Sequence, residues 1–317
     1  MIFGTPVSWF LFEVLSVAVF LAAVIHAAGR TKAKQHILVM IAFVIYAGAF
    51  ENIGVWQNIY DYSTDRIMMI GKVPLSILLI EAVTLYCALW LAEQLRLPWW
   101  AGAFVAGAIG SLQDMTVDPS NVFDIHVIDG VASGQWNWTM HYEGGFFGIP
   151  VFNFSGWFTM MLYFALFVGL LDRLGERKGR SWLITGAPLL AIVPSLLVLV
   201  SPINLVLLFG WDALQGYGLL AESVMLALNF GVAIFLLFRY AKWDKPLDLK
   251  LDGVLLALPV IMHLWDIGLA FAAGIEEGYV PSLLFTAIHV ALLAAVLRAG
   301  LRANAASREV DAGVQAA

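Results

Sequence analysis

The chain has 317 residues, of which 61% are hydrophobic and 13% are charged, and its mean hydropathy is +0.85. A soluble domain is about half apolar and about one quarter charged, so this composition excludes an ordinary soluble domain and predicts an integral membrane protein. The net charge of −6 does not suggest a nucleic-acid partner, and the single cysteine, Cys87, excludes an internal disulfide and a cysteine-rich metal or iron–sulfur site.

Nine segments are apolar over a length that can cross a bilayer, which takes about 20 helical residues. In chain order they are residues 6–28, 36–57, 73–95, 99–115, 155–173, 182–201, 219–240, 252–273 and 281–301. The segment 202–218 is amphipathic and could form a short interfacial helix. We therefore predict an all-α fold, a polytopic helix bundle forming one domain over residues 1–302, with a disordered tail over residues 303–317.

The basic residues predict how this bundle is oriented, because cytoplasmic loops of membrane proteins carry an excess of Lys and Arg. Of the 17 Lys and Arg residues, only Arg66 and Lys72 follow an even-numbered span. An N-terminus outside and a C-terminus in the cytoplasm explain this bias. We expect a multi-pass protein of the cytoplasmic membrane whose longest connection, residues 116–154, lies outside.

The predicted spans carry ionisable residues that all lie in the outer half of the bundle. Each would cost about 2.5–3.5 kcal/mol at the centre of the bilayer, so these side chains must face the bundle interior. They either form structural pairs that tie helices together or surround a functional cavity, and their restriction to one side favours the cavity. The residues are Glu13, Glu51, Glu81, Asp114, Glu222, His263, Asp266 and His289.

Two of these residues, His263 and Asp266, are three positions apart and share one helix face. The pair can be a histidine oriented by a carboxylate, a proton relay or a polar pair that satisfies itself. A metal site that includes His289 is compatible with the residue types, but no HExxH-like spacing supports one, and we predict no metal. We include all three residues among those that could contact a substrate.

The connection 116–154 is long and rich in aromatic residues, which argues against disorder. We expect it to fold back over the outer mouth of the bundle. An alternative for the tryptophans alone is a belt at the membrane interface. The acidic, histidine and aromatic residues of this connection that could serve a site are Asp118, Asp124, His126, Asp129, Trp136, Trp138, His141, Tyr142 and Glu143.

Two groups of residues together resemble the bacterial and archaeal membrane carotenoid hydratases. The first group is Phe50-Glu51-Asn52-Ile53-Gly54, followed by Tyr60-Asp61-Tyr62 and Val73-Pro74. The second group is Asp114, Asp118-Pro119, Trp136-Asn137-Trp138, Tyr142 and the box from Gly148 to Trp157. The match covers residues 46–160. It departs from the family pattern where Asp124, His126 and Asp129 lengthen the loop and where Glu81 replaces an apolar or aromatic residue.

The resemblance implies an enzyme, a hydro-lyase that adds water to the terminal double bond of an acyclic carotenoid and leaves a tertiary hydroxyl. It implies no redox cofactor. The long polyene of a carotenoid or another polyisoprenoid can lie among lipid tails, while its end group enters a polar pocket that water reaches from outside.

Hydration of an isolated alkene requires three kinds of group. A protonated carboxyl group must donate to the less substituted carbon, aromatic faces must stabilise the tertiary carbocation, and a polar group must position water and accept its proton. We assign the acid to Asp114, with Asp118 as its like-charged neighbour, and the orientation of water to Glu51 with Asn153. The remaining walls are expected from Trp136, Trp138, Trp157, Tyr62, Tyr142 and Glu81.

Two other classes of protein fit part of this pattern. A different membrane enzyme of polyisoprenoids or lipids, such as a cyclase or an isomerase, would also use buried acids. A proton-coupled carrier would too. The one-sided polar layer and the lack of a repeated half-structure disfavour the carrier.

Overall fold

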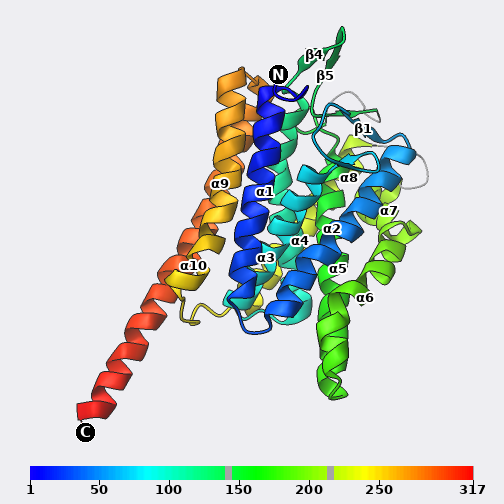
Figure 1. Ribbon diagram of the computed structural model, residues 1–317. Coiled ribbons are helices and arrows are strands. Elements are labelled where there is room, and N and C mark those ends of the chain that lie inside the picture. Colours follow the sequence, from blue (N-terminus) through cyan, green and yellow to red (C-terminus); the bar gives the residue numbers. More distant parts are fainter. Residues whose placement is uncertain (140–144, 213–217, 317) are drawn as a thin grey trace.

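The computed structural model describes residues 1–139, 145–212 and 218–316, and these residues are almost entirely helical (Figure 1). Beyond the bundle, α10 continues as a helix through most of the segment predicted as a tail (Figure 1). The helices are α1 (Val7–Ala28), α2 (Ala33–Trp56), α3 (Leu75–Gln94), α4 (Trp99–Val122), α5 (Val151–Arg177), α6 (Ser181–Leu199), α7 (Pro202–Phe209), α8 (Leu219–Tyr240), α9 (Leu249–Ala273) and α10 (Glu276–Ala316).

Eight of the described helices are long and apolar enough to cross a membrane: α1, α2, α3, α5, α6, α8, α9 and α10. The chain is therefore a polytopic helical membrane protein, as predicted. The helix α4 corresponds to the predicted span 99–115 but is not among the eight. It carries Gln113, Asp114, Thr116 and Asp118, and neighbouring helices bury all four side chains.

The helix α4 lies at the centre of the bundle, in contact with α3, α5, α8, α9 and α10. Protein rather than lipid surrounds it, so it can carry polar side chains that a lipid-facing helix could not. Its backbone approaches α5 closely at Gly107, where a Cβ atom would lie 2.7 Å from the carbonyl oxygen of Phe158. Small residues at such contacts let two membrane helices pack tightly.

The boundaries of the long connection differ from the hydropathy prediction. The helix α4 continues through Pro119 to Val122 and α5 begins at Val151, so the connection covers residues 123–150 rather than 116–154. Buried polar residues in the last turns of α4 hide this part of the helix from a hydropathy analysis. The consequence is that Asp114 and Asp118 stand four residues apart on one helix face.

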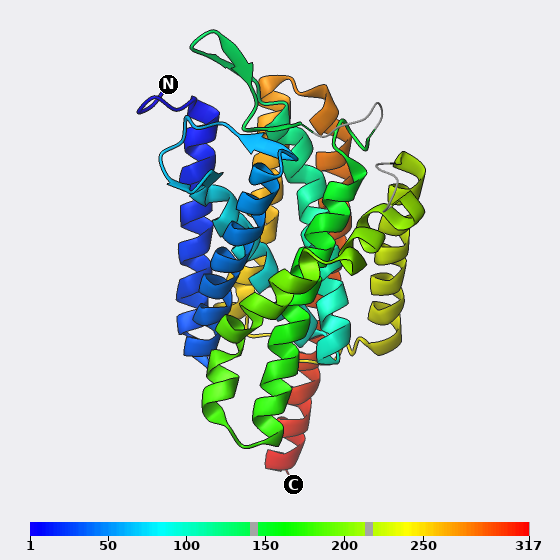
Figure 2. The same cartoon turned by 90° about the vertical axis from the view of Figure 1, so that its right-hand side faces the viewer.

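Short strands lie at one end of the bundle, an addition to the predicted all-α fold. The antiparallel pairs are β1 (Tyr60–Tyr62) with β6 (Trp136–Trp138), β2 (Met69–Ile70) with β3 (Val73–Pro74), and β4 (His126–Ile128) with β5 (Val131–Ser133). We call this the capped end; the N-terminus lies there too (Figure 2). The basic turns after α1 and α5 lie at the opposite, basic end (Figure 1).

The ambiguous segment 202–218 begins as α7, which follows α6 after a break at Val200 and Ser201. The helix α7 is followed by a short 3-10 turn, Gly210–Asp212, and residues 213–217 lie outside the described part of the chain. Whereas α6 packs against α2 and α5, α7 packs against α5 and α8. The break therefore directs the chain away from α2.

Candidate active site

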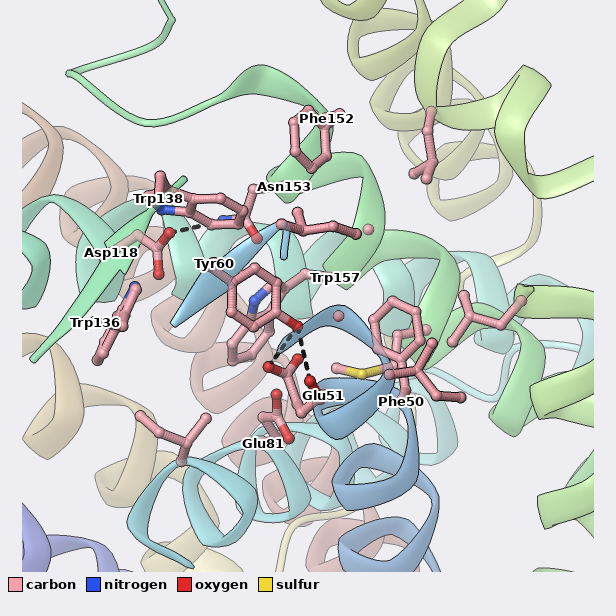
Figure 3. Close-up of a pocket in the computed structure, with 18 of the residues that line it drawn as sticks. Phe50, Glu51, Tyr60, Glu81, Asp118, Trp136, Trp138, Phe152, Asn153 and Trp157 are labelled. Carbon is pink, nitrogen blue, oxygen red and sulfur yellow. Dashed lines mark hydrogen bonds between the residues drawn. The ribbon is translucent and has the colours of Figure 1, made fainter. Parts of the chain in front are cut away.

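A cavity of about 450 Å³ lies among α2, α3, α4, α5 and the α6–α7 break, with β1 and β6 over it (Figure 3). This volume falls within the usual range of sites that enclose a small molecule. Most of the residues predicted for the site line this one cavity. They are Glu51, Tyr62, Glu81, Asp118, Trp136, Trp138, Asn153 and Trp157.

The β1–β6 pair places four aromatic side chains over the cavity. Its register sets Tyr60 opposite Trp138 and Tyr62 opposite Trp136. Alternate residues of a strand point to the same face, so both tyrosines and both tryptophans face inward, and all four line the cavity. The ring centroids of the cross-strand partners are 5.0 Å and 5.9 Å apart. Two segments more than 70 residues apart thus form one aromatic cover.

One carboxyl pair, Glu51 of α2 and Glu81 of α3, joins the two helices at the cavity wall. The hydroxyl groups of Tyr60 and Tyr62 donate hydrogen bonds to Oε2 of Glu51 at 2.9 Å and 2.7 Å. Burial raises the pKa of both tyrosines well above the usual range, so they remain donors. The fully buried Glu81 lies beside Glu51 (Figure 3), and neither of its oxygens receives a hydrogen bond from a donor in the described residues.

Two buried carboxylates at such proximity, without a countercharge, repel each other strongly. A proton held between them removes this repulsion. Because Glu51 already accepts two phenolic hydrogen bonds, Glu51 is the natural carboxylate of the pair and Glu81 the natural holder of the proton.

A second carboxyl pair, Asp114 and Asp118, lies on α4. The Nδ2 atom of Asn153 donates to Oδ2 of Asp114 at 2.6 Å and to Oδ2 of Asp118 at 2.9 Å. One amide therefore holds both carboxyl groups together. Only Asp118 lines the cavity, and Asp114 lies behind it, with 0% of its surface exposed.

Indole rings surround the carboxyl group of Asp118. Trp136 and Trp138 flank it, and Trp157 lines the cavity nearby (Figure 3). The electron-rich faces of indoles attract a cation, and the attraction is strongest where water is excluded. The geometry therefore combines a buried carboxyl group with aromatic faces of the kind that stabilise positive charge.

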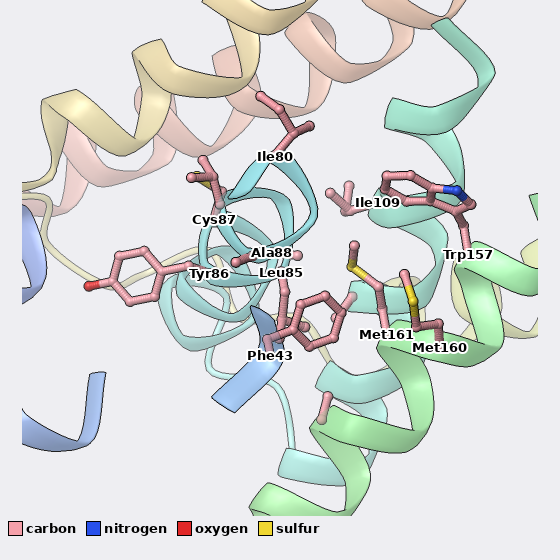
Figure 4. Close-up of a cluster of buried hydrophobic side chains, with 14 of the residues drawn as sticks. Phe43, Ile80, Leu85, Tyr86, Cys87, Ala88, Ile109, Trp157, Met160 and Met161 are labelled. Carbon is pink, nitrogen blue, oxygen red and sulfur yellow. The ribbon is translucent and has the colours of Figure 1, made fainter. Parts of the chain in front are cut away.

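Apolar side chains close the cavity toward the basic end. Ile80 of α3 and Trp157 and Met160 of α5 line its inner part. Ile109 and Met161 pack around them in the hydrophobic core between α3, α4 and α5 (Figure 4). No Lys, Arg or His side chain lines the cavity within the described part of the chain. The site is therefore acidic, aromatic and apolar.

Residues of the first sequence group have supporting roles that the sequence did not assign to them. A Cβ atom at Gly54 would clash with the Tyr60 hydroxyl, so glycine makes room for the hydrogen bond to Glu51. Asn52 holds the following turn, since its Nδ2 donates to the Ile70 carbonyl at 3.0 Å and its Oδ1 accepts from the Lys72 amide at 2.9 Å. Aromatic residues alternate with polar residues in Tyr60-Asp61-Tyr62 and in Trp136-Asn137-Trp138, and this alternation could have predicted two strands with their aromatic side chains on one face.

The predicted residues His263, Asp266 and His289 form a separate cluster and do not line the cavity. Thr116 of α4 donates to Oδ2 of Asp266 at 2.9 Å and lies 3.1 Å from Nδ1 of His263. Nε2 of His263 and Nδ1 of His289 are 2.8 Å apart. This cluster joins α4, α9 and α10. These contacts tie the three helices together, although one oxygen of Asp266 receives no hydrogen bond from the described residues.

Glu13 and Glu222, two other ionisable residues of the predicted layer, do not line the cavity. Glu13 accepts from the Ile67 amide, with its oxygens 3.3 Å and 3.2 Å from the nitrogen, and lies 3.9 Å from Arg66. Burial lowers the pKa of Arg66 to about 10, although the carboxylate of Glu13 opposes this shift. Glu222 accepts from the Phe152 amide at 3.0 Å. Tyr142 lies outside the described residues.

Acidic and histidine side chains are the residue types that could ligate a metal ion here. Within the described part of the chain, no group of three or more His, Cys, Asp or Glu residues is arranged to hold a metal ion. The carboxyl groups of the cavity instead pair with each other, with tyrosines and with Asn153.

The fold and the cavity together define a polytopic membrane protein with a buried acidic site. The family model described as carotenoid biosynthesis protein matches residues 7–221, more than half of the chain. The chain belongs to this family and has a role in carotenoid biosynthesis, which confirms the family resemblance inferred from the sequence. No curated protein and no solved structure matches the chain.

Proposed function

We propose that the protein is a carotenoid hydratase that adds water to the terminal double bond of an acyclic end group. Membership of the carotenoid biosynthesis family supports the class of substrate. The observation that carries the proposal is one cavity in which a paired aspartate, a tyrosine-bound glutamate and three indole rings face the same space.

The first step is protonation of the alkene. Asp118 is the member of its pair that can touch a substrate, so it donates its proton to the less substituted carbon and forms the new C–H bond. Asp114, which was our first choice from the sequence, lies behind it and shares the Asn153 amide. Asp114 therefore holds the proton that restores Asp118. General acid catalysis of this kind contributes about 10²–10⁴-fold to the rate.

The second step is capture of the tertiary carbocation by water. Trp136, Trp138 and Trp157 stabilise the cation until a water molecule attacks it. Glu51, held by two tyrosine hydroxyl groups, orients that water and accepts its proton as the new C–O bond forms. Proton return from Glu51 through water to the aspartate pair completes the cycle, and the net change is the addition of one water molecule.

The distribution of basic residues supports a cytoplasmic-membrane location with the capped end outside. The cavity would then receive water from the outer side and the lipophilic substrate from the bilayer. Water and the hydrocarbon end group of the substrate would therefore meet at the depth of the two carboxyl pairs.

The direct test is expression in a bacterium that accumulates an acyclic carotenoid such as lycopene, followed by chromatography and mass spectrometry of the pigments. The wild-type chain is expected to yield a more polar pigment heavier by one water, and Asp118→Asn is expected to yield none. A new pigment of unchanged mass would contradict hydration and would establish a cyclase or isomerase that begins with the same protonation.

A further inference from the structure

The cavity reaches the protein surface at the α6–α7 break. Val200 and Leu205 line the cavity, yet 51% and 40% of their surfaces are exposed. Leu199, Leu208 and Phe209 line the same part of the cavity. The wall at this position is entirely apolar apart from Asn204. The cavity thus has an apolar mouth at the side of the bundle, away from the two carboxyl pairs.

The opposite side of the mouth is formed by the end of α2 near the capped end. Phe50 and Ile53 of α2, and Gln57 directly after this helix, line the cavity together with residues of α7. The helices α2 and α6 pack against each other, but the chain then turns away along α5 and α8 (Figure 2). The opening therefore lies between two membrane-facing elements rather than at the end of the bundle.

The break that creates the mouth is fixed by its own contacts. Asn204 is buried and donates from Nδ2 to the Leu199 carbonyl at 2.8 Å. Its Oδ1 accepts from the Tyr163 hydroxyl at 3.2 Å. The residue after α7, Gly210, has φ +57° and ψ −128°, a conformation that favours glycine. These contacts fix the break between α6 and α7 in place.

The outer surface at the mouth is suited to lipid. Ile203 and Val206 of α7 are 68% and 51% exposed. A soluble protein would rarely display such a patch, whereas the hydrocarbon core of a bilayer covers it without cost. A hydrocarbon chain can therefore pass from the bilayer into the cavity without meeting water.

We propose that this mouth is a lateral portal through which the polyene of the substrate extends into the bilayer while its end group occupies the cavity. The proposal rests on the function proposed for the same cavity and specifies its substrate class. Recognition is confined to the acyclic end group, and the length and the far end of the chain remain outside the protein. The protein then accepts linear isoprenoids of different lengths that share one terminal unit.

The test narrows the portal with Leu205→Trp and, separately, Val200→Trp. Because both side chains are partly exposed, a tryptophan can be accommodated at either position and the variant protein should still fold. Val193→Trp is the matched control, because Val193 of α6 is 64% exposed and does not line the cavity. Each protein is assayed with a long acyclic polyene and with a short isoprenoid that has the same terminal unit. The polyene retained per protein after purification is measured by absorbance.

The portal variants are expected to lose about tenfold or more in kcat/KM and in retained polyene for the long substrate. For the short isoprenoid they should remain near wild type, and Val193→Trp should match wild type on both substrates. Unchanged turnover and retention of the long polyene in both folded portal variants would overturn the proposal. If no variant hydrates anything, yet wild type retains polyene and the portal variants do not, the portal stands and the hydratase function fails.

Discussion

The two ends of the bundle each contain a polar cluster, and the two clusters differ in charge balance. At the basic end, Asp252 accepts hydrogen bonds from Arg30 at 3.2 Å and Trp90 at 3.1 Å, and its Oδ1 lies 3.2 Å from His26. Arg30 also donates to both oxygens of Glu93 at 2.8 Å. Every acid in this cluster has a cationic partner.

The cavity near the capped end has acids without cations. Its carboxyl groups face each other, and one oxygen of Asp114 and both oxygens of Glu81 receive no hydrogen bond from the described residues. Balanced buried charges join helices, whereas unbalanced ones are costly and persist where they serve a function. We therefore infer a structural role for the Asp252 cluster and a catalytic role for the acids of the cavity. Substitutions at the two clusters should therefore separate stability from activity.

The largest effect is expected for Asp118→Asn, which keeps the shape of the side chain and removes the proton donor. Hydration should fall by about 10²–10⁴-fold. The thermal unfolding midpoint in detergent should stay at or above the wild-type value, because the change removes a like-charge contact. A variant that keeps more than half of the wild-type rate would remove Asp118 from the mechanism.

Gly54→Ala should have the next largest effect on activity. Its new methyl group would displace the Tyr60 hydroxyl from Glu51, and a misplacement of about 1 Å can cost about 10²-fold in rate. Gly231→Ala on α8 is a suitable control, because nothing lies within 4 Å of its added Cβ. Equal initial rates for the two variants would show that the Tyr60 position does not matter.

Tyr62→Phe removes one of the two hydroxyl groups that hold Glu51 but keeps the ring beside Trp136. One hydrogen bond to a charged group is worth about 1.5–3 kcal/mol, so a rate loss of roughly tenfold to a hundredfold is expected, with little change in the KM. Steady-state kinetics of the purified protein provide the measurement. A change confined to the KM would indicate substrate packing rather than orientation of water.

The smallest effect on activity is expected for Asp252→Asn at the basic end. The free energy of unfolding should fall by about 1–3 kcal/mol, because Arg30 and His26 lose their shared carboxylate. The rate per folded protein should remain near wild type. If this variant lost activity while its unfolding midpoint stayed unchanged, the division between a structural and a chemical cluster would be wrong.

The sequence predicted the membrane bundle because hydropathy reports directly on lipid-facing helices. It also singled out Glu51 and Glu81, because charged residues inside spans are costly and stand out, whereas Asp118 lay beyond the predicted span. It did not predict the end of α4, since burial by protein permits polar residues that lower hydropathy. The helical continuation through Pro119 decides that Asp114 and Asp118 share one face.

Long-range contacts account for what the sequence could not predict. The sequence places three further residues at about the same depth in the bilayer as Glu51, namely His263, Asp266 and His289. Only the packing of α9 and α10 on α4 shows that this cluster faces Thr116. The β1–β6 pairing likewise joins two distant loops and makes Tyr60 part of the site. A pattern along the chain gives the depth of a residue in the bilayer but not its direction around the helix.

The most direct test of the central claim, that the unbalanced acids of the cavity protonate an alkene carbon, is hydration in deuterium oxide followed by mass spectrometry. After exchange of the hydroxyl deuterium with ordinary water, each new hydroxyl group should be accompanied by one deuterium that stays bound to carbon. A hydrated product without carbon-bound deuterium would contradict proton transfer from an exchangeable acid and with it the assignment of chemistry to this cavity.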